Sequence, residues 1–307
     1  MGDQRAHDGP ANGGLTYNSG VVETTYSFAR YLSAKKTIDD RALNAQVWEA
    51  LARALPAGPL RVLEVGCGIG TMVERALERG LVRRGAYTAV DKEPDNIADA
   101  RERLAPLAAR FPEVQLDLRS ECALKFSARP EHRGQYDLVI AHAFLDLLHL
   151  PSAVPLFLRT LRPGGLFYFT LNFDGATLFQ PEIDPAFDAL IESLYHRTMD
   201  ERVTDGQPSG DSRSGRHLFG ELRAAGAHLL AAGSSDWTVF AGPHGYPADE
   251  AYFLHFIIHT VGGALRGQPE LDPQRFEGWV AERHAQIERG ELAYIAHQMD
   301  FCGRVAE

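Results

Sequence analysis

The chain has 307 residues, of which 45% are hydrophobic and 9% aromatic. This is the composition of a globular protein with a full-sized core, and it excludes a disordered or fibrous chain. The 31 Lys and Arg residues against 41 Asp and Glu residues give a formal net charge of −10. Because such a charge repels a phosphate backbone, we expect no nucleic-acid partner.

The cysteines and the apolar stretches indicate where the protein works. Cys67, Cys122 and Cys302 form no Cys-x-x-Cys pair and leave one thiol unpaired, which indicates a reducing compartment and no structural zinc site. The chain begins without the apolar run of a signal peptide, and its most continuous apolar stretch, 251–265, is shorter than the roughly twenty residues of a membrane span. We therefore predict a soluble cytoplasmic protein with no membrane partner and no metal.

Two segments precede the periodic part of the chain. Residues 1–16 are rich in Gly, Asn and Asp without periodicity, which predicts a mobile arm. Residues 17–55 carry apolar side chains largely at helical spacing and predict two N-terminal helices with a break near Lys35-Lys36-Thr37. We expect these helices to form part of a lid over the main domain, residues 56–307.

From residue 61, short β-rich runs alternate with helical segments. This alternation predicts right-handed βαβ units and a parallel sheet with helices on both faces. The predicted strands are 61–65, 86–90, 114–118, 136–141 and 166–171, and the predicted helices are 71–79, 94–109 and 153–161. Helical insertions interrupt the rhythm at about 176–216 and 243–290, with helices expected at 185–199, 248–265 and 273–289. Outside them we expect a helix at 217–225 and strands at 227–232 and 292–301.

The most informative stretch runs from Glu64 to Gly70 and reads E-V-G-C-G-I-G, a buried strand followed by a glycine-rich turn and a helix. Three glycines at alternate positions allow a sharp turn and leave no Cβ to block a ligand that lies across it. Free amides at the start of the following helix can meet a ligand carboxylate. The next strand ends on Asp91, placed to accept both hydroxyls of a ribose. Together these features predict a nucleoside site.

Glycine spacing separates two classes of nucleoside ligand. A dinucleotide fingerprint requires glycine at Thr71, whereas the third glycine is Gly70. The pattern Glu-x-Gly-x-Gly-x-Gly resembles motif I of the class I S-adenosylmethionine-dependent methyltransferases. The resemblance extends over residues 58–172, through Asp91, the fourth strand at 136–140 and the Pro-Gly-Gly turn at 163–165. It implies an α/β fold with a seven-stranded, mostly parallel, doubly wound sheet whose last strand, 292–301, is antiparallel.

The resemblance also implies a cofactor and its binding residues. The cofactor is S-adenosyl-L-methionine, with S-adenosyl-L-homocysteine as product. Glu64 anchors the turn or the cofactor's amino group. The residues expected to line the methionine and ribose parts are Gly66, Cys67, Gly68, Gly70, Asp91 and Lys92. The adenine amino group meets Glu121 or Cys122, or Asp117 if the third strand is shorter.

Methyl transfer is an in-line displacement that needs a desolvated, aligned pocket. His142, at the end of the fourth strand, is the candidate base and His149 its rival; each can instead be a buried structural histidine or a cofactor contact. The candidate substrate residues are Tyr26, Tyr31, Asn172, Asp174 and Tyr195. His255 and His259 share one face of a predicted helix, but their apolar neighbours favour packing over a metal site.

We therefore predict an S-adenosylmethionine-dependent methyltransferase that acts on a small-molecule acceptor. Alternative functions are an S-adenosylmethionine-binding protein that catalyses a different reaction and, with less support, an NAD-dependent oxidoreductase. The insertions and the segment 17–55 can roof the carboxyl ends of the strands, which favours a small acceptor. The stretch 204–216 is poor in apolar residues, and we expect it to move as a lid.

Overall fold

The computed structural model describes residues 26–204 and 206–306. The predicted arm at 1–16 and the first part of the segment 17–55 lie outside these residues. In the described part of the chain no helix combines the length and the hydropathy that a membrane span needs.

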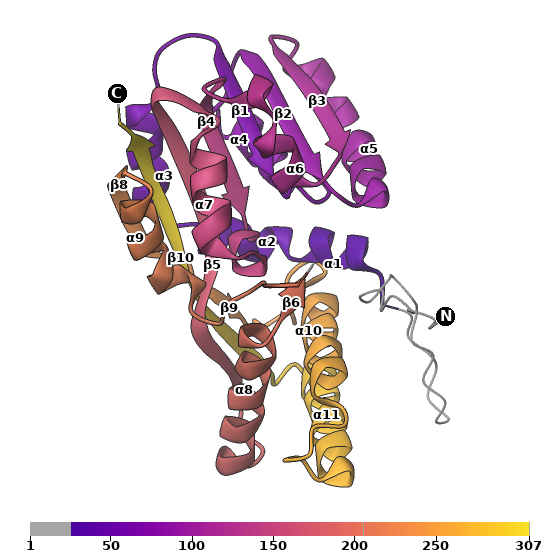
Figure 1. Ribbon diagram of the computed structural model, residues 1–307. Coiled ribbons are helices and arrows are strands. Elements are labelled where there is room, and N and C mark those ends of the chain that lie inside the picture. The colour runs from indigo at the N-terminus through magenta and orange to yellow at the C-terminus, as the bar shows by residue number, and fades with distance from the viewer. Residues whose placement is uncertain (1–25, 205, 307) are drawn as a thin grey trace, which may run out of the picture.

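An eight-stranded sheet forms the centre of the fold, with strands in the order β3-β2-β1-β4-β5-β10-β8 (Figure 1). In this order, the five neighbouring strands β3, β2, β1, β4 and β5 are parallel to one another. Strand β10 is antiparallel to both of its neighbours, β5 and β8. The α/β class and the antiparallel last strand are confirmed, and the strand count is eight instead of seven because short β9 pairs with β10. The strands are β1 (Leu60–Val65), β2 (Gly85–Asp91), β3 (Val114–Ser120), β4 (Tyr136–His142), β5 (Leu161–Gln180), β8 (Ala227–Ser234), β9 (Trp237–Val239) and β10 (Ala293–Val305).

Helices cover both faces of the sheet because its strands are apolar on both faces. Successive strand residues point to opposite faces, so Val62 joins one hydrophobic cluster and Leu63 the other. The first cluster includes side chains of α2 to α5, and the second includes those of α6, α7 and α9. The helices are α1 (Phe28–Ala34), α2 (Lys36–Ala42), α3 (Ala45–Ala54), α4 (Thr71–Glu78), α5 (Pro94–Arg110), α6 (Ala123–Ala128), α7 (Leu150–Leu158), α8 (Pro185–Asp200), α9 (Ser214–Ala224), α10 (Glu250–Leu265) and α11 (Pro273–Glu288).

Strand β5 is far longer than the predicted strand 166–171. It has 20 residues and pairs with β10 as far as Gln180. In Figure 1 the β5–β10 pair continues below the rest of the sheet toward α8, α10 and α11. The turn-forming residues at 163–165 and Gly175 lie inside this strand, which pairs with β10 between Leu166 and Gln180 with two shifts of register. The turn-rich stretch after α8 forms a small hairpin of β6 (Val203–Thr204) and β7 (Gln207–Pro208).

The described part of the N-terminal segment, residues 26–55, holds three helices instead of the predicted two. One break falls at Lys35, as predicted, and a second falls at Leu43 and Asn44. The Asn44 side chain accepts a hydrogen bond from the amide of Val47, which caps the N-terminus of α3. This capping residue explains why the longer periodic run divides.

Helices α1 and α2 cross between the parallel part of the sheet and the α10–α11 pair (Figure 1). Ion pairs fix α2 on both sides. Arg41 donates to the buried Glu250 of α10 at 2.6 Å, and Arg75 of α4 donates to Asp40 at 2.6 Å. The predicted lid helices are therefore anchored to both halves of the fold.

Candidate active site

The glycine-rich turn joins β1 to α4 at the carboxyl end of the parallel strands. Gly66, Gly68 and Gly70 have φ values of +69°, +51° and +80°, a backbone region that residues with a Cβ disfavour. A Cβ added at Gly66 would lie 2.3 Å from the Phe144 ring, and one at Gly68 would lie 3.3 Å from Leu32. The turn thus requires glycine for its conformation and for the close approach of α1 and of the loop after β4.

Asp91 ends β2 beside this turn, as the sequence predicts. Its Oδ2 accepts a hydrogen bond from the amide of Gly68 at 2.9 Å. Its Oδ1 accepts from the amide of Glu93 at 3.0 Å and from Asn96 Nδ2 at 3.1 Å. A carboxylate has about four lone-pair sites, so Asp91 can still accept from a ligand. The neighbouring Lys92 is exposed.

Glu64 and Cys67 are buried on either side of the first glycine. Tyr87 donates its hydroxyl to Glu64 Oε2 at 2.6 Å. Burial raises the pKa of the Glu64 carboxyl to about 8, and the bond from Tyr87 only partly opposes this rise. Glu64 is therefore mostly neutral at pH 7. Burial also raises the pKa of the Cys67 thiol, which keeps it protonated.

The three adenine candidates follow or lie within β3. The backbone amide of Glu121 donates to the carbonyl of Asp91 at 2.8 Å, which brings the end of β3 beside the ribose candidate. Cys122 carries a half-buried free thiol at the N-cap of α6. Asp117 lies earlier on β3 and pairs with Arg119 at 2.7 Å. Glu121 and Cys122 are thus the candidates nearest to the end of β2.

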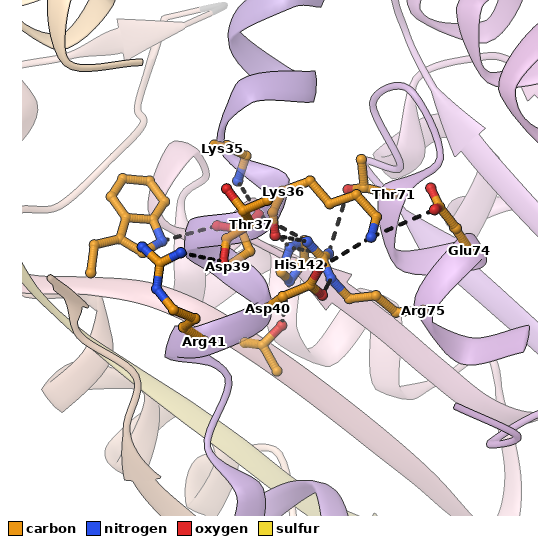
Figure 2. A network of polar contacts seen from close by, with 12 residues as sticks. Lys35, Lys36, Thr37, Asp39, Asp40, Arg41, Thr71, Glu74, Arg75 and His142 are labelled. Carbon is orange, nitrogen blue, oxygen red and sulfur yellow. Dashed lines mark hydrogen bonds and ion pairs between the residues drawn. The ribbon is translucent and has the colours of Figure 1, made fainter. Parts of the chain in front are cut away.

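A buried polar network joins α2 to the end of β4 (Figure 2). At its centre is the fully buried Asp39, whose Oδ2 lies 3.0 Å from Lys35 Nζ and whose Oδ1 accepts from Trp237 Nε1 at 2.9 Å. The same Oδ2 lies 3.2 Å from His142 Nε2, and an Nη of Arg75 lies 3.0 Å from that ring nitrogen. Four elements far apart in the sequence therefore meet at one carboxylate.

His142 has protein partners at both ring nitrogens, since Nδ1 lies 2.8 Å from Thr170 Oγ1. Burial lowers the pKa of His142 to about 4. The charge of Arg75 lowers this pKa further, whereas the contact with Asp39 raises it. The imidazole is therefore neutral at pH 7. Although burial opposes it, the charge of Lys35 and the contact with His142 hold the pKa of Asp39 below its ordinary value. The network holds an ionised carboxylate among cations and a neutral ring.

His149 lies outside this network. It occupies the N-cap position of α7, and its Nδ1 is 3.0 Å from Ser152 Oγ. It lines a cavity of about 230 Å³ together with Gly210, Asp211 and His217. A larger cavity, about 410 Å³, is lined by residues of β5, α8 and the segment after β7. Neither cavity includes a residue of the glycine-rich turn.

The aromatic substrate candidates come from α1, from the residues before it and from α8. Tyr31 stacks on Phe256 of α10 with ring centroids 4.2 Å apart. Tyr26 lies over His259 with centroids 4.5 Å apart. Tyr195 is half-buried on α8. The structure thus brings Tyr26 and Tyr31 against α10, where packing alone accounts for most of their contacts.

The polar substrate candidates both lie on β5. Asn172 is buried and donates its Nδ2 to the carbonyl of Met299 at 2.9 Å. Asp174 is also buried, and its Oδ1 accepts from Arg216 Nε at 2.8 Å. These contacts tie β5 to β10 and to α9.

His255 and His259 lie on one face of α10, as expected. The Nδ1 of His255 lies 2.7 Å from His284 Nδ1, and its Nε2 lies 2.8 Å from a carboxylate oxygen of Glu288. Within residues 26–204 and 206–306 no group of three or more His, Cys, Asp or Glu side chains is arranged to hold a metal ion.

Sequence reasoning did not select Asp39, Arg75 or Asp146. Asp39 and Arg75 lie on two helices of mixed composition, α2 and α4, where a charged residue usually faces solvent. Asp146 follows β4 by four residues, a place where ligand-binding side chains occur in such sheets, and this signal was available. Its Oδ1 is buried and has no hydrogen-bond partner among the described residues.

Part of the chain, including the glycine-rich turn, is similar in sequence to known methyltransferases. Residues 63–167 match the family described as Methyltransferase domain. A trans-aconitate 2-methyltransferase of Methylobacterium nodulans is 34% identical over 138 residues, which are 45% of this chain and 46% of that protein. A ubiquinone biosynthesis O-methyltransferase of Marinobacter nauticus is 33% identical over 117 residues, 36% of this chain and 44% of that protein. The chain spans about half the length of these curated relatives.

Among solved structures, the geranyl diphosphate C-methyltransferase of Streptomyces coelicolor A3(2), in complex with Mg²⁺, geranyl diphosphate and S-adenosyl-L-homocysteine, aligns with a TM-score of 0.44 and 12% sequence identity. The alignment covers 85% of this chain and 77% of that chain.

Proposed function

We propose that the whole protein is a class I methyltransferase that transfers a methyl group from S-adenosylmethionine to a small-molecule acceptor, since residues 63–167 match the Methyltransferase domain family. The observation that carries this proposal is the turn of three glycines after β1, held by Asp91 at the end of β2. The names of the trans-aconitate and ubiquinone relatives describe small acceptors, which agrees with the proposal.

The residues of the turn fit the cofactor of this class. Gly70 starts α4 in a left-handed conformation with no side-chain cap, so the first amides of α4 are available to a carboxylate. Gly66 and Gly68 leave the turn without side chains, and Asp91 keeps about one lone-pair site, at Oδ2, for a ribose hydroxyl. We propose that these four residues hold the cofactor, with Glu121 or Cys122 beside its adenine. The bound cofactor supplies a methyl group activated by a positively charged sulfur.

The chain's own contribution is to exclude water and to hold the acceptor in line. Leu32 of α1 and Phe144 after β4 bring apolar side chains onto the glycine turn. The network around Asp39 fixes α2 over the end of β4. Displacement at a sulfonium is faster in such a desolvated, rigid site. His142 has both nitrogens engaged and is assigned here to positioning; its role as base, and that of His149, stays a prediction.

Calorimetry with two ligands tests the cofactor assignment. We expect S-adenosylhomocysteine to bind the full-length protein and NAD not to bind. Binding of NAD without binding of S-adenosylhomocysteine would refute the proposal in favour of an oxidoreductase. Transfer of labelled methyl from S-adenosylmethionine to a small acceptor then separates a methyltransferase from a protein that uses the cofactor for a different reaction.

A further inference from the structure

The loop after β4 holds an acidic side chain with no protein partner. Asp146 lies in the short helix η2 (Leu145–Leu147), four residues beyond the end of β4. Its Oδ1 is buried and has no hydrogen-bond partner within the described residues. Burial raises the pKa of this carboxyl to about 6, so it is mostly ionised at pH 7. An unpaired buried carboxylate oxygen costs stability, and such groups gather at functional sites.

The negative charge of Asp146 acts on two tyrosine hydroxyls. Tyr31 comes from α1 and Tyr195 from α8, and neither hydroxyl has a hydrogen-bond partner in the described part of the chain. Burial raises the pKa of both phenols, that of Tyr195 to about 12. The charges of Asp39 and, to a smaller extent, Asp146 add to the rise at Tyr31, and the charge of Asp146 adds to it at Tyr195. Both hydroxyls therefore stay protonated at pH 7. The carboxylate and the two hydroxyls form three hydrogen-bond acceptors from three separate elements.

A cation that forms no ion pair within the described residues lies near Asp146. Arg202 follows α8, is half-buried, and forms no ion pair among the described residues. A Cβ added at Gly210 would lie 3.2 Å from an Nη of Arg202 and 3.3 Å from the backbone oxygen of Asp146. The guanidinium end and residue 146 thus flank the same point of the segment predicted to act as a lid. The charge of Arg202 also opposes the rise in the pKa of Asp146.

We propose that Asp146, Tyr31, Tyr195 and Arg202 bind the methyl acceptor, and that the acceptor is a small zwitterion with an amine at Asp146 and an anionic group at Arg202. This inference rests on the proposed function. An ammonium group carries three N–H donors, which match one carboxylate and two hydroxyl oxygens, whereas a hydroxyl carries one donor. The fork of Arg202 matches a carboxylate or phosphate.

In this arrangement Asp146 acts as the base that removes a proton from the acceptor's ammonium group. The acceptor's ammonium passes one proton to the Asp146 carboxylate, which frees the nitrogen lone pair. That pair forms the new nitrogen–carbon bond while the carbon–sulfur bond of the donor breaks and its electrons stay on sulfur. The product is a methylated ammonium beside a neutral thioether, and the proton on Asp146 leaves to solvent when the site opens.

Three compounds with the same phenyl group test the charge requirement. Phenylalanine carries both charges, 2-phenylethylamine only the ammonium, and 3-phenylpropionate only the carboxylate. Binding is measured by calorimetry on the full chain saturated with S-adenosylhomocysteine. We expect phenylalanine to bind at least tenfold more tightly than either of the others. In Asp146→Asn its affinity should fall to that of 3-phenylpropionate, and in Arg202→Gln to that of 2-phenylethylamine.

Matched controls and a stability measurement make the result decisive. Glu102→Gln and Arg223→Gln change exposed residues of α5 and α9 and should leave all three affinities unchanged. Asp146→Asn should keep or raise the melting temperature of the ligand-free protein, because it removes an unpaired buried charge. A lowered melting temperature, equal responses to the three compounds, or no response to any of them overturns the inference. Failure of S-adenosylhomocysteine to bind would instead refute the proposed function itself.

Discussion

Replacing Glu64 by glutamine tests whether the buried carboxyl beside the glycine-rich turn is neutral. Glu64 is 1% exposed and accepts the Tyr87 hydroxyl at 2.6 Å. Glutamine has nearly the same shape, and its carbonyl oxygen can accept the same hydrogen bond. Glu64→Gln therefore removes the titration of this carboxyl while leaving its packing and its partner in place.

The size of the effect follows from linkage between protonation and folding. In the folded protein burial raises the pKa of Glu64 from an ordinary 4.5 to about 8. The unfolded chain releases the proton near pH 4.5 and the folded chain keeps it until about pH 8. The contribution of Glu64 to stability is therefore fully present below pH 4.5 and is lost as pH rises through this window, by about 1.4 kcal/mol per pH unit. At pH 7 the loss is about 3 kcal/mol, and the glutamine variant does not suffer it.

Urea unfolding of both proteins without cofactor, between pH 5 and 8, measures this difference. We expect the free energy of unfolding of Glu64→Gln to rise relative to wild type by about 3 kcal/mol across the range. Other groups that titrate there, such as Asp146 and Asp300, occur in both proteins and cancel. The exposed Glu102→Gln serves as control and should follow wild type. Parallel curves for wild type and Glu64→Gln would refute the buried, neutral state of Glu64.

Further predictions concern the cofactor turn, the buried network and the lid. Asp91→Ala should weaken S-adenosylmethionine binding about ten- to a hundred-fold in calorimetry, because it removes a charge-assisted contact worth roughly 1.5–3 kcal/mol. Gly68→Val should abolish that binding, since a β-branched side chain disfavours the φ of +51° and would press on Leu32. Asp39→Asn should lower the free energy of unfolding by about 3–5 kcal/mol, because it leaves buried cations without a counter-charge. Hydrogen exchange at residues 206–216 should slow when S-adenosylhomocysteine and acceptor are both bound.

Each of these expectations has a result that contradicts it. Unchanged affinity in a folded Asp91→Ala protein would remove this carboxylate from the site. Tight cofactor binding by Gly68→Val would show that the turn tolerates a side chain. Wild-type stability of Asp39→Asn would show that the network does not depend on its charge. Exchange at 206–216 that is equally fast, or equally slow, in all liganded states would exclude a moving lid.

The sequence by itself determined the cofactor turn and the positions of the first four parallel strands along the chain. The glycines from Gly66 to Gly70, the strand before them and Asp91 at the end of the next strand act within one βαβ unit, so their spacing along the chain specifies their geometry. Strands 61–65, 86–90, 114–118 and 136–141 were predicted within two residues at either end for the same reason, because alternation of apolar side chains is a local property.

Only the tertiary structure decided which side chains surround the reacting end of the sheet. Trp237 reaches Asp39 from 198 positions further along the chain, and His142 reaches it from 103 positions away. Strand β5 continues to Gln180 because β10 pairs with it, although the sequence predicted a strand over 166–171 only. Asp146, Tyr31 and Tyr195 come from η2, α1 and α8, and the charge of Asp146 acts on both phenols only in the folded chain. Such contacts depend on the packing of distant elements, and the spacing of residues along the chain carries no record of them.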